Sequence, residues 1–424
     1  MSVDTGLSIA ALRSLAVLVP VLLAVVLWFA APNRRTRGAA FLALLWNFIA
    51  LLLIDALAVQ QEWWTFGTTG NMWSQVPIDV VLGWAALWGA VPILLARWVN
   101  PVITVLVLVA GDVLAMSSLQ PLVTLEPTWW WGECLAVGAA LVPGVVLGYL
   151  TDHGLALRTR AVMQVVLFGS LLGFVVPTVA FEAAGSGWGQ RADVGGPLDL
   201  ILLQLMALVA IVALRAVAEF AVVGRGTPFP WDPPQRLVTT GPYAYVANPM
   251  QLSAVLLLLL GGAVLREPWL VAGALLGAAF SAGLAAWHEQ SELLARHSES
   301  WTSYRRSVRD WIPRWTPTPA IAPAILYASV SCDPCSRVGP WFVRRSPVGL
   351  DVAVAEGHPQ DLRRVRYEGA STADGTRAIG AALEHLSLGW AILGWLFRAP
   401  VFAWFLQLLV DATGGGPRSI RQTE

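Results

Sequence analysis

Lysine is absent from this chain of 424 residues, so each of the 27 basic residues is an arginine. An arginine side chain keeps its proton in proteins, which excludes it as a general base. Acid–base chemistry therefore falls to histidine, glutamate, aspartate, tyrosine or cysteine. Cysteine is also scarce. There are three, and Cys134 lies in an apolar run, which excludes a zinc site built from four cysteines. We expect no metal site.

Charged residues are few, and apolar residues are many. Only 13% of the residues are charged, whereas 56% are hydrophobic, the mean hydropathy is +0.63 and there are 22 tryptophans. A run of roughly 20 apolar residues is long enough to cross about 30 Å of hydrocarbon. About nine such runs predict an α-helical multispan membrane protein. They are 9–31, 38–59, 78–96, 101–120, 130–150, 160–181, 197–222, 250–265 and 268–287.

The connections between these runs carry arginine unevenly. By the positive-inside rule, the side with more basic residues is cytoplasmic. This predicts a multi-pass protein of the cell membrane with its N-terminus outside and its C-terminal region in the cytoplasm. The arginines on the cytoplasmic side are Arg34, Arg35, Arg37, Arg97, Arg158, Arg160, Arg225 and Arg236, against Arg191 and Arg266 on the other.

Five ionisable residues lie inside the predicted spans. A charge near the middle of the membrane costs roughly 2.5–3.5 kcal/mol on insertion scales, so such residues face the bundle interior. We interpret Asp55, Asp112 and Glu133 as polar contacts that hold helices together. Arg215 and Glu219 are four residues apart on one helix, which predicts an ion pair near its cytoplasmic end. A wall of an active site is the alternative for that pair.

A polar segment rich in proline and glycine interrupts the apolar runs at residues 224–250. It reads GRGTPFPWDPPQRLVTTGPYAYVANPM. Its prolines forbid a continuous helix, and backbone groups without hydrogen bonds in hydrocarbon cost several kcal/mol each. The segment must lie at the membrane surface or line a cavity walled by protein, and irregular backbone of that kind indicates a ligand site.

Two motifs flank the hydrophobic hairpin that follows. Residues 241–250, GPYAYVANPM, lead into the hairpin, and residues 288–293, HEQSEL, follow it. Four further residues continue the second motif: Trp301, Tyr304, Val308 and Pro313. Over about residues 200–318 this ordered pair resembles the membrane methyltransferase superfamily that contains isoprenylcysteine carboxyl methyltransferases and phospholipid N-methyltransferases.

The resemblance implies S-adenosyl-L-methionine as the cofactor, held between membrane and cytosol, and a lipophilic acceptor. The residues it assigns to the cofactor are Gly241, Pro242, Tyr243, Tyr245, Asn248, Pro249, Glu289 and Gln290. Ala247 and Gln290 stand where the family usually has arginine and a second glutamate. Either Arg236 or Arg305 replaces the missing arginine in space, or cofactor affinity is reduced. Glu292 shares a helix face with Glu289 and can replace the missing acid.

Methyl transfer from a sulfonium is an in-line displacement in which positioning and desolvation do most of the work. A base is needed only if the acceptor arrives protonated. Glu289, Glu292 and His288 are the candidates for that base, and Tyr243 or Tyr245 can orient the acceptor. Carboxylate, amine and thiol acceptors all remain open.

The last hundred or so residues return to soluble composition after a linker at residues 316–319. A short apolar strand runs into Cys332-Asp333-Pro334-Cys335 and then a helix. This order is typical of thioredoxin-like redox domains, in which a helix N-terminus makes the first thiol nucleophilic. The tail resembles the DCC family of thiol-disulfide oxidoreductases, which implies redox roles for Cys332 and Cys335. Two ordinary reduced thiols in a structural domain are the alternative.

The final apolar run, 390–410, contains Arg398 and Pro400. A charge and a proline within the run predict a broken amphipathic pair of helices, packed on the domain or on the membrane surface, in place of a tenth span.

We therefore expect an α-helical multispan membrane protein with a C-terminal cytoplasmic α/β thioredoxin-like domain. Its regions are a six-span part of unknown role (1–195), a methyltransferase-like core (196–318) and a C-x-x-C domain (319–424). The alternatives to a methyltransferase are an NADPH-dependent membrane lipid reductase on the same fold and a non-catalytic membrane anchor for the redox domain. The expected partners are a lipophilic small molecule and the bilayer, with no nucleic acid.

Overall fold

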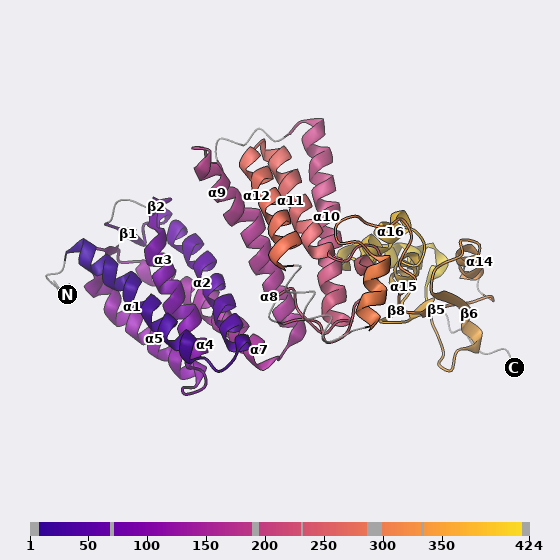
Figure 1. Ribbon diagram of the computed structural model, residues 1–424, viewed down its shortest axis with the longest axis horizontal. Helices are drawn as coiled ribbons and strands as arrows, with labels where there is room; N and C mark the ends of the chain where they lie inside the picture. The colour runs from indigo at the N-terminus through magenta and orange to yellow at the C-terminus, as the bar shows by residue number, and fades with distance from the viewer. Residues whose placement is uncertain are drawn as a thin grey trace. The chain divides into compact units, whose positions relative to one another are not determined.

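The computed structural model describes residues 8–67, 72–188, 195–229, 232–285, 299–331 and 335–417 of the chain. These residues fold into two compact units (Figure 1). The first unit comprises Met1–Val175 with Phe229–Asp232, and the second comprises Val176–Pro228 with Pro233–Glu424.

The first unit is a bundle of helices with two short pairs of strands. Its helices are α1 (Ile9–Ala30), α2 (Arg34–Gln60), α3 (Ile78–Ala85), η1 (Ala86–Ala90), α4 (Val91–Leu95), α5 (Pro101–Ala115), η2 (Met116–Leu119), α6 (Trp129–Ala136), η3 (Val137–Leu141), α7 (Val142–His153), α8 (Leu157–Ser170) and η4 (Leu171–Val175). Its strands are β1 (Trp64–Phe66), β2 (Met72–Trp73), β3 (Val76–Pro77) and β4 (Val123–Leu125). Strand β1 pairs with β4, and β2 pairs with β3, both antiparallel.

The second unit begins with long helices and ends with a small sheet. Its helices are α9 (Val176–Ala183), α10 (Pro197–Val222), η6 (Gly241–Ala244), α11 (Pro249–Leu265), α12 (Pro268–Phe280), η7 (Ser281–Ala285), η8 (Cys335–Arg337), α14 (Val338–Val343), η9 (Ala355–Gly357), α15 (Thr376–Leu383), α16 (Leu388–Arg398), α17 (Pro400–Val410) and η10 (Asp411–Gly415). Its strands are β5 (Ala324–Ala328), β6 (Leu350–Val354), β7 (Arg366–Glu368) and β8 (Thr372–Asp374). Residues 299–307 are also helical.

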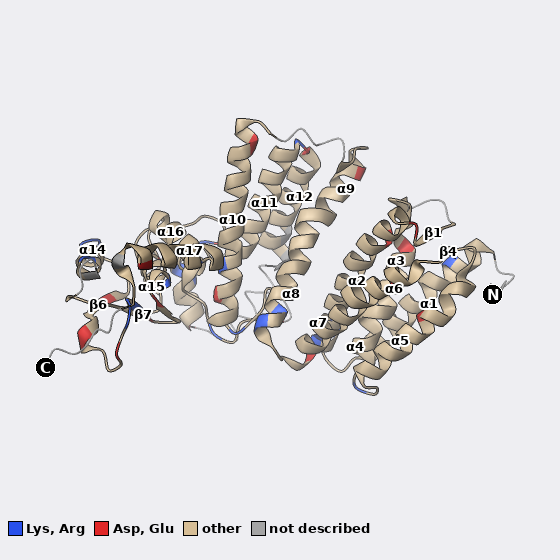
Figure 2. Cartoon of the chain, turned by 180° about the vertical axis from the view of Figure 1, so that it is seen from behind, with Lys and Arg blue, Asp and Glu red and all other residues tan. Residues whose placement is uncertain are grey.

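Seven helices among the described residues are long and apolar enough to cross a membrane. They are Ile9–Ala30, Arg34–Gln60, Ile78–Leu95, Pro101–Leu119, Trp129–His153, Leu157–Ala183 and Pro197–Val222. They coincide with the first seven predicted spans, which confirms a multi-pass helical membrane protein. Charged residues gather at helix ends and around the small sheet, and the middles of the spanning helices carry few of them (Figure 2).

The last two of the nine predicted spans form the hairpin of α11 and α12. Helix α11 has 17 residues, fewer than the roughly 20 that cross the hydrocarbon. Helix α12 continues directly into η7, so this second helix is described from Pro268 to Ala285. That the two helices of the hairpin are full spans stays a prediction. The hairpin turns where predicted: Arg266 ends α11 in the left-handed conformation with φ of 51°, and the Glu267 side chain accepts a hydrogen bond from the Trp269 backbone N–H at the start of α12.

Proline marks the start of several helices. The first residues of α5, α10, α11 and α12 are Pro101, Pro197, Pro249 and Pro268. Proline suits this position because its φ is already helical and the N–H it lacks would have no partner in the helix. The boundaries of these helices are therefore local properties of the sequence.

Helix α2 forms the centre of the first unit and packs against α3, η1 and α7. Small residues allow close packing. A Cβ on Gly89 would lie 2.5 Å from the Ala43 carbonyl oxygen, and one on Gly144 would lie 2.1 Å from the Asn47 side chain. Larger side chains at either glycine would push the helices apart.

In the second unit, α10, α11 and α12 run side by side (Figure 1). The sheet that follows has the strand order β6-β5-β7-β8. Strand β5 is parallel to β6, with α14 between them in the chain, and the pairs β5–β7 and β7–β8 are antiparallel. Leu326, Phe342 and Leu383 belong to its buried core.

The final apolar run is broken where predicted. Helices α16 and α17 meet at Ala399 and differ in direction by 88°. Pro400 begins α17 and cannot donate the hydrogen bond that would continue α16. One face of α17 is tied to the sheet domain, since the Thr376 backbone N–H donates to Gln407 Oε1 at 2.9 Å.

Candidate functional site

The GPY motif starts with a glycine that the local packing requires. Gly241 has φ of 60°, a conformation that costs other residues roughly 1–2 kcal/mol. A Cβ at this position would also approach Glu219 Cγ to 3.2 Å. The Thr240 hydroxyl donates a hydrogen bond to Glu219 Oε1. The motif is thereby seated against the end of α10.

The two motifs that flank the hairpin in sequence are joined in space. The Tyr304 hydroxyl donates to the Tyr243 carbonyl oxygen at 2.8 Å. The Ala247 backbone N–H donates to the Arg309 carbonyl oxygen at 2.9 Å. Residues 241–248 and 304–310 therefore form one structure, although α11 and α12 separate them in the chain.

Asn248 and Arg305 meet on a shared carboxylate. The Asn248 side-chain amide donates to Asp310 Oδ1 at 3.1 Å, and Arg305 Nη2 donates to Asp310 Oδ2 at 2.6 Å. The Arg305 guanidinium also lies over the Trp301 ring, with Cζ 5.5 Å from the ring centroid. Arg305 Nη1 is buried and has no hydrogen-bond partner among the described residues.

Arg305 is thus placed beside the position where Ala247 replaces the expected arginine. The other candidate for that replacement, Arg236, is exposed. Of the two predicted substitutes, only Arg305 lies within the joined motifs. Its Nη1 has no described hydrogen-bond partner and can donate to an anionic group.

Tyr243 and Tyr245 are both buried. The Tyr245 hydroxyl donates to the Glu384 carbonyl oxygen at 2.9 Å, and its ring meets Trp395 edge-on at 5.9 Å between centroids. Burial, followed by the nearby Glu384 charge, raises the pKa of Tyr245 above its usual range. The Tyr245 hydroxyl is thus hydrogen-bonded within the protein, to Glu384 of the C-terminal domain. The role of Tyr245 in cofactor binding stays a prediction.

The predicted ion pair between Arg215 and Glu219 is confirmed and belongs to a larger buried network. Arg215 Nε lies 3.6 Å from Glu384 Oε1, and Arg398 Nη1 donates to the same oxygen at 2.8 Å. Glu219 is 2% exposed and Glu384 is 3% exposed. Two arginines and two glutamates therefore balance each other's charge, and they tie α10 to α15 and α16.

A carboxylate that the sequence did not single out organises the approach to the C-x-x-C motif. Glu356 Oε1 accepts hydrogen bonds from the Ser329 hydroxyl at 2.6 Å and the Ser331 hydroxyl at 2.7 Å. The Val330 backbone N–H donates to the same oxygen at 3.1 Å. Burial raises the pKa of Glu356, but these hydrogen bonds outweigh it and lower the pKa to about 2. Sequence reasoning had no signal for this contact, since Glu356 lies 25 residues or more from its donors.

Several predicted site residues lie outside the described part of the chain. They are His288, Glu289, Gln290, Glu292 and Cys332. Cys335 is the first residue of η8, and its side chain is also outside the description. The described candidates lie in η6, at the first residue of α11 and in the short link between them: Gly241, Pro242, Tyr243, Tyr245, Asn248 and Pro249.

Comparisons of the chain with models of known protein families, with curated proteins and with solved structures find no match. The likeness to membrane methyltransferases therefore rests on the motif residues of the sequence.

Proposed function

We propose that the chain is an integral membrane methyltransferase that transfers a methyl group from S-adenosyl-L-methionine to a lipophilic acceptor. One observation carries this proposal. Residues 241–248 and 304–310, which belong to the two motifs of the methyltransferase resemblance, hydrogen-bond to each other across the hairpin. A site assembled from both motifs requires this contact.

The cofactor's amino-acid end is assigned to Arg305. Its Nη1 donors have no described partner, whereas its Nη2 is held by Asp310. An arginine that is already positioned by a carboxylate and an aromatic ring loses little freedom when it binds a second anion. Asn248, on the same Asp310, orders this group further.

Catalysis in this proposal comes from positioning. The buried loop of Gly241, Pro242 and Tyr243 holds the sulfonium near the acceptor, and Glu289 or Glu292 takes a proton if the acceptor carries one. The acceptor reaches the site from the bilayer. The orientation with the N-terminus outside and the C-terminal domain in the cytoplasm remains part of the proposal.

The C-terminal region is proposed to be a thioredoxin-like domain with thiol-disulfide oxidoreductase activity at Cys332 and Cys335. The β5–α14–β6 unit supports this, because the C-x-x-C motif lies between the strand and the helix. The hydrogen bonds from residues 329–331 to Glu356 add support, since they order the segment that leads into Cys332.

A second candidate function is a non-catalytic membrane anchor for the C-terminal domain. The Tyr245 hydroxyl favours it, because a motif residue is engaged with Glu384 of that domain. The buried ion-pair network also favours the anchor function, since it joins the membrane part to the domain through Arg215, Glu219, Glu384 and Arg398.

Calorimetric titration of the purified full-length protein separates these functions. We expect binding of S-adenosylmethionine and S-adenosylhomocysteine, and none of NADPH. Arg305→Ala and Glu289→Ala should each weaken methyl-cofactor binding about tenfold or more, the loss typical of a hydrogen bond to a charged group. Arg306→Ala, which removes an exposed arginine next to Arg305, is the matched control.

Failure to bind either methyl cofactor would leave the anchor function. Binding of NADPH alone would favour the lipid reductase. Equal losses in Arg305→Ala and Arg306→Ala would remove Arg305 from the site.

A further inference from the structure

Helix α17 turns its large apolar side chains away from the domain that carries it. Of its 11 residues, only Ala403 is buried. In a surface helix of a soluble domain the apolar side faces the core and the polar side faces water. Helix α17 has the reverse arrangement. Its exposed side chains include Val401, Phe402, Trp404, Phe405, Leu408 and Leu409.

The inner face of α17 is small or polar, and the sheet domain satisfies it. Gln407 Oε1 accepts a hydrogen bond from the Thr376 backbone N–H at 2.9 Å, and Gln407 Nε2 donates to Asp411 Oδ1 at 2.8 Å. Asp411, in the turn that follows α17, also accepts two hydrogen bonds from Arg364 at 2.7 and 2.8 Å. Ala403, Gln407 and Asp411 are four residues apart and share one side of the helix. These contacts fix which face of α17 points outward.

The outward face carries no charge. No residue from Ala399 to Val410 is charged. The charged residues at the two ends of this stretch are engaged with the domain, since Arg398 donates to Glu384 and Asp411 accepts from Arg364. Large uncharged apolar patches on a protein surface mark sites that contact a membrane or another protein. The outward face of α17 therefore requires an apolar partner.

Helix α16, which leads into α17, packs against a membrane-spanning helix. Val212 of α10 packs on the cluster that contains Ala391 and Trp395 of α16. At 1.5 Å per residue, the 26 residues of α10 measure roughly 39 Å, and Val212 lies roughly 15 Å from the end of the helix. The hydrocarbon is about 30 Å thick, so Val212 lies within it or at its edge. The α16–α17 pair therefore begins at the level of the bilayer.

The shape of the pair suits a position in the membrane interface. Helices α16 and α17 have 11 residues each, about half the length that crosses the hydrocarbon, and they differ in direction by 88°. Helices that lie in the interface bury one apolar face about 5–10 Å deep and keep a polar face on the other side. Tryptophan is enriched at this depth, and Trp404 is 64% exposed on α17.

The bilayer is the apolar partner that the rest of the chain already requires. Seven of its described helices are long and apolar enough to cross a membrane. Leu203 and Leu214 of α10 are exposed, as expected of a helix in contact with lipid. Because α16 packs on α10, the outward face of α17 continues from a surface that meets the bilayer. A second copy of the chain or another protein has no comparable support among the described residues.

We propose that α17 lies in the bilayer interface and docks the sheet domain onto the membrane. Phe405 and Leu409, at the centre of the outward face, insert among the lipid acyl chains. Gln407 and Asp411 keep the inner face on the domain. The two packings predicted for this apolar run, on the domain and on the membrane surface, thus occupy opposite faces of one helix. The docking depends neither on methyl transfer nor on redox activity.

The test is photolabelling of the full-length wild-type protein in nanodiscs that hold one copy each. The probe is a phosphatidylcholine with a diazirine in its acyl chain. Trypsin cuts after arginine and lysine, and the chain has no lysine, so α17 is released in a single peptide, 399–418. Peptide 192–215, from α10, is the positive reference. Peptide 346–363, which contains the exposed Val354 of β6, is the negative reference. We expect peptide 399–418 to be labelled like 192–215 and several-fold more than 346–363.

Glutamates on the outward face provide a second readout. The double variant Phe405→Glu with Leu409→Glu places two charges one turn apart where lipid is expected. Both side chains are exposed, so the contacts of α17 with the domain are kept. Labelling of peptide 399–418 should fall several-fold, because charged side chains are costly in hydrocarbon, and labelling of 192–215 should stay at its wild-type level. Val354→Glu, at an exposed position of the same domain, is the matched control and should change neither.

The wild-type comparison needs no substitution, so it holds even if a variant fails to fold. Labelling of peptide 399–418 at the level of 346–363 overturns the proposal and leaves a second copy or another protein as the partner. Labelling that the double variant does not lower also overturns it, because lipid would then not contact the outward face. Since each disc holds one copy, contact between copies cannot produce the expected result.

Discussion

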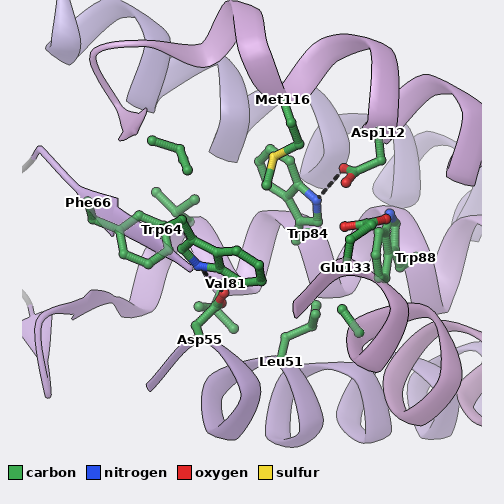
Figure 3. A pocket seen from close by; sticks show the side chains of 13 residues that line it. Leu51, Asp55, Trp64, Phe66, Val81, Trp84, Trp88, Asp112, Met116 and Glu133 are labelled. Carbon is green, nitrogen blue, oxygen red and sulfur yellow. Dashed lines mark hydrogen bonds between the residues drawn. The ribbon is translucent and has the colours of Figure 1, made fainter. Parts of the chain in front are cut away.

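Buried acids occur in both units, and their surroundings differ. In the second unit, Glu219 and Glu384 are matched by Arg215 and Arg398, so the network carries its own counter-charges. In the first unit, Asp55, Asp112 and Glu133 line a cavity with no described cation in its wall (Figure 3). A group of charges that is balanced within the protein holds elements together, whereas an acid buried without a cation favours its uncharged form. Burial alone does not distinguish the two.

The largest expected change in stability comes from removing one charge of the buried network in the second unit. Glu384→Gln leaves Arg398 and Arg215 buried without their shared carboxylate, and removing one partner of a buried ion pair typically destabilises by about 3–5 kcal/mol. We expect a loss of that size in the free energy of unfolding, measured by denaturant titration in detergent. Asp361→Asn, at an exposed acid of the same unit, is the control. If Glu384→Gln lowers the free energy of unfolding no more than Asp361→Asn does, the network contributes little to stability.

The next effect concerns the glycine that seats the motif loop against this network. Gly241→Ala places a Cβ in the left-handed conformation and against Glu219, which should destabilise the protein by about 1–2 kcal/mol. Gly111→Ala is the matched control, because open space surrounds that helical position and alanine should stabilise it by up to about 1 kcal/mol. Denaturant titration measures both. A neutral Gly241→Ala would show that the loop relaxes away from Glu219.

Substitution of a cavity acid should have a much smaller effect than substitution of Glu384. Glu133→Gln leaves no arginine without its partner, because no described cation lines the cavity, so we expect a change of no more than about 1 kcal/mol in the free energy of unfolding, measured by denaturant titration. A loss of stability as large as that of Glu384→Gln would erase the distinction between the two acid groups.

Glu356 represents a third arrangement, in which an acid accepts hydrogen bonds and has no arginine partner among the described residues. We expect its substitution to change the stability least. Its pKa is about 2 in the folded domain against an ordinary value of 4.5. The folded state therefore releases the proton more readily than the unfolded state, and this stabilisation is complete above about pH 4.5. It is lost as the pH falls from about 4.5 toward 2.

The measurement is the pH dependence of thermal unfolding of the full-length protein. Glu356→Gln should flatten the curve between about pH 4.5 and 2. Asp361→Asn removes an exposed acid of the same domain that has no contact with Ser329 or Ser331, so it should leave the curve unchanged. A variant with the wild-type curve would show that the Ser329 and Ser331 contacts do not form in solution.

Local features of the sequence predicted much of the fold. The apolar runs located seven spanning helices, and the turn of the hairpin was placed at Arg266–Pro268. The spacing of Arg215 and Glu219 predicted their ion pair, because both residues lie on one helix. That the two hairpin helices are full spans stays a prediction, because the described part of the second one ends at Ala285.

The candidate sites were predictable only in part. The two motifs were recognised as residue patterns, but their junction through Tyr304 and Asn248 depends on how the hairpin folds back. The cavity acids were predicted to face the interior, yet nothing in the sequence around Trp84 marks it as the hydrogen-bond donor to Asp112. Contacts between residues far apart in the chain leave no local signal.

The sequence by itself determined the membrane class, the approximate positions of the spanning helices and the residues available for chemistry, because length, apolarity and proline position act locally. Only the tertiary structure decided which buried charges are balanced. Arg398 reaches Glu384, whereas no described cation lines the cavity of Asp55, Asp112 and Glu133. The energy of a buried charge depends on its neighbours in space, and those neighbours come from distant parts of the chain.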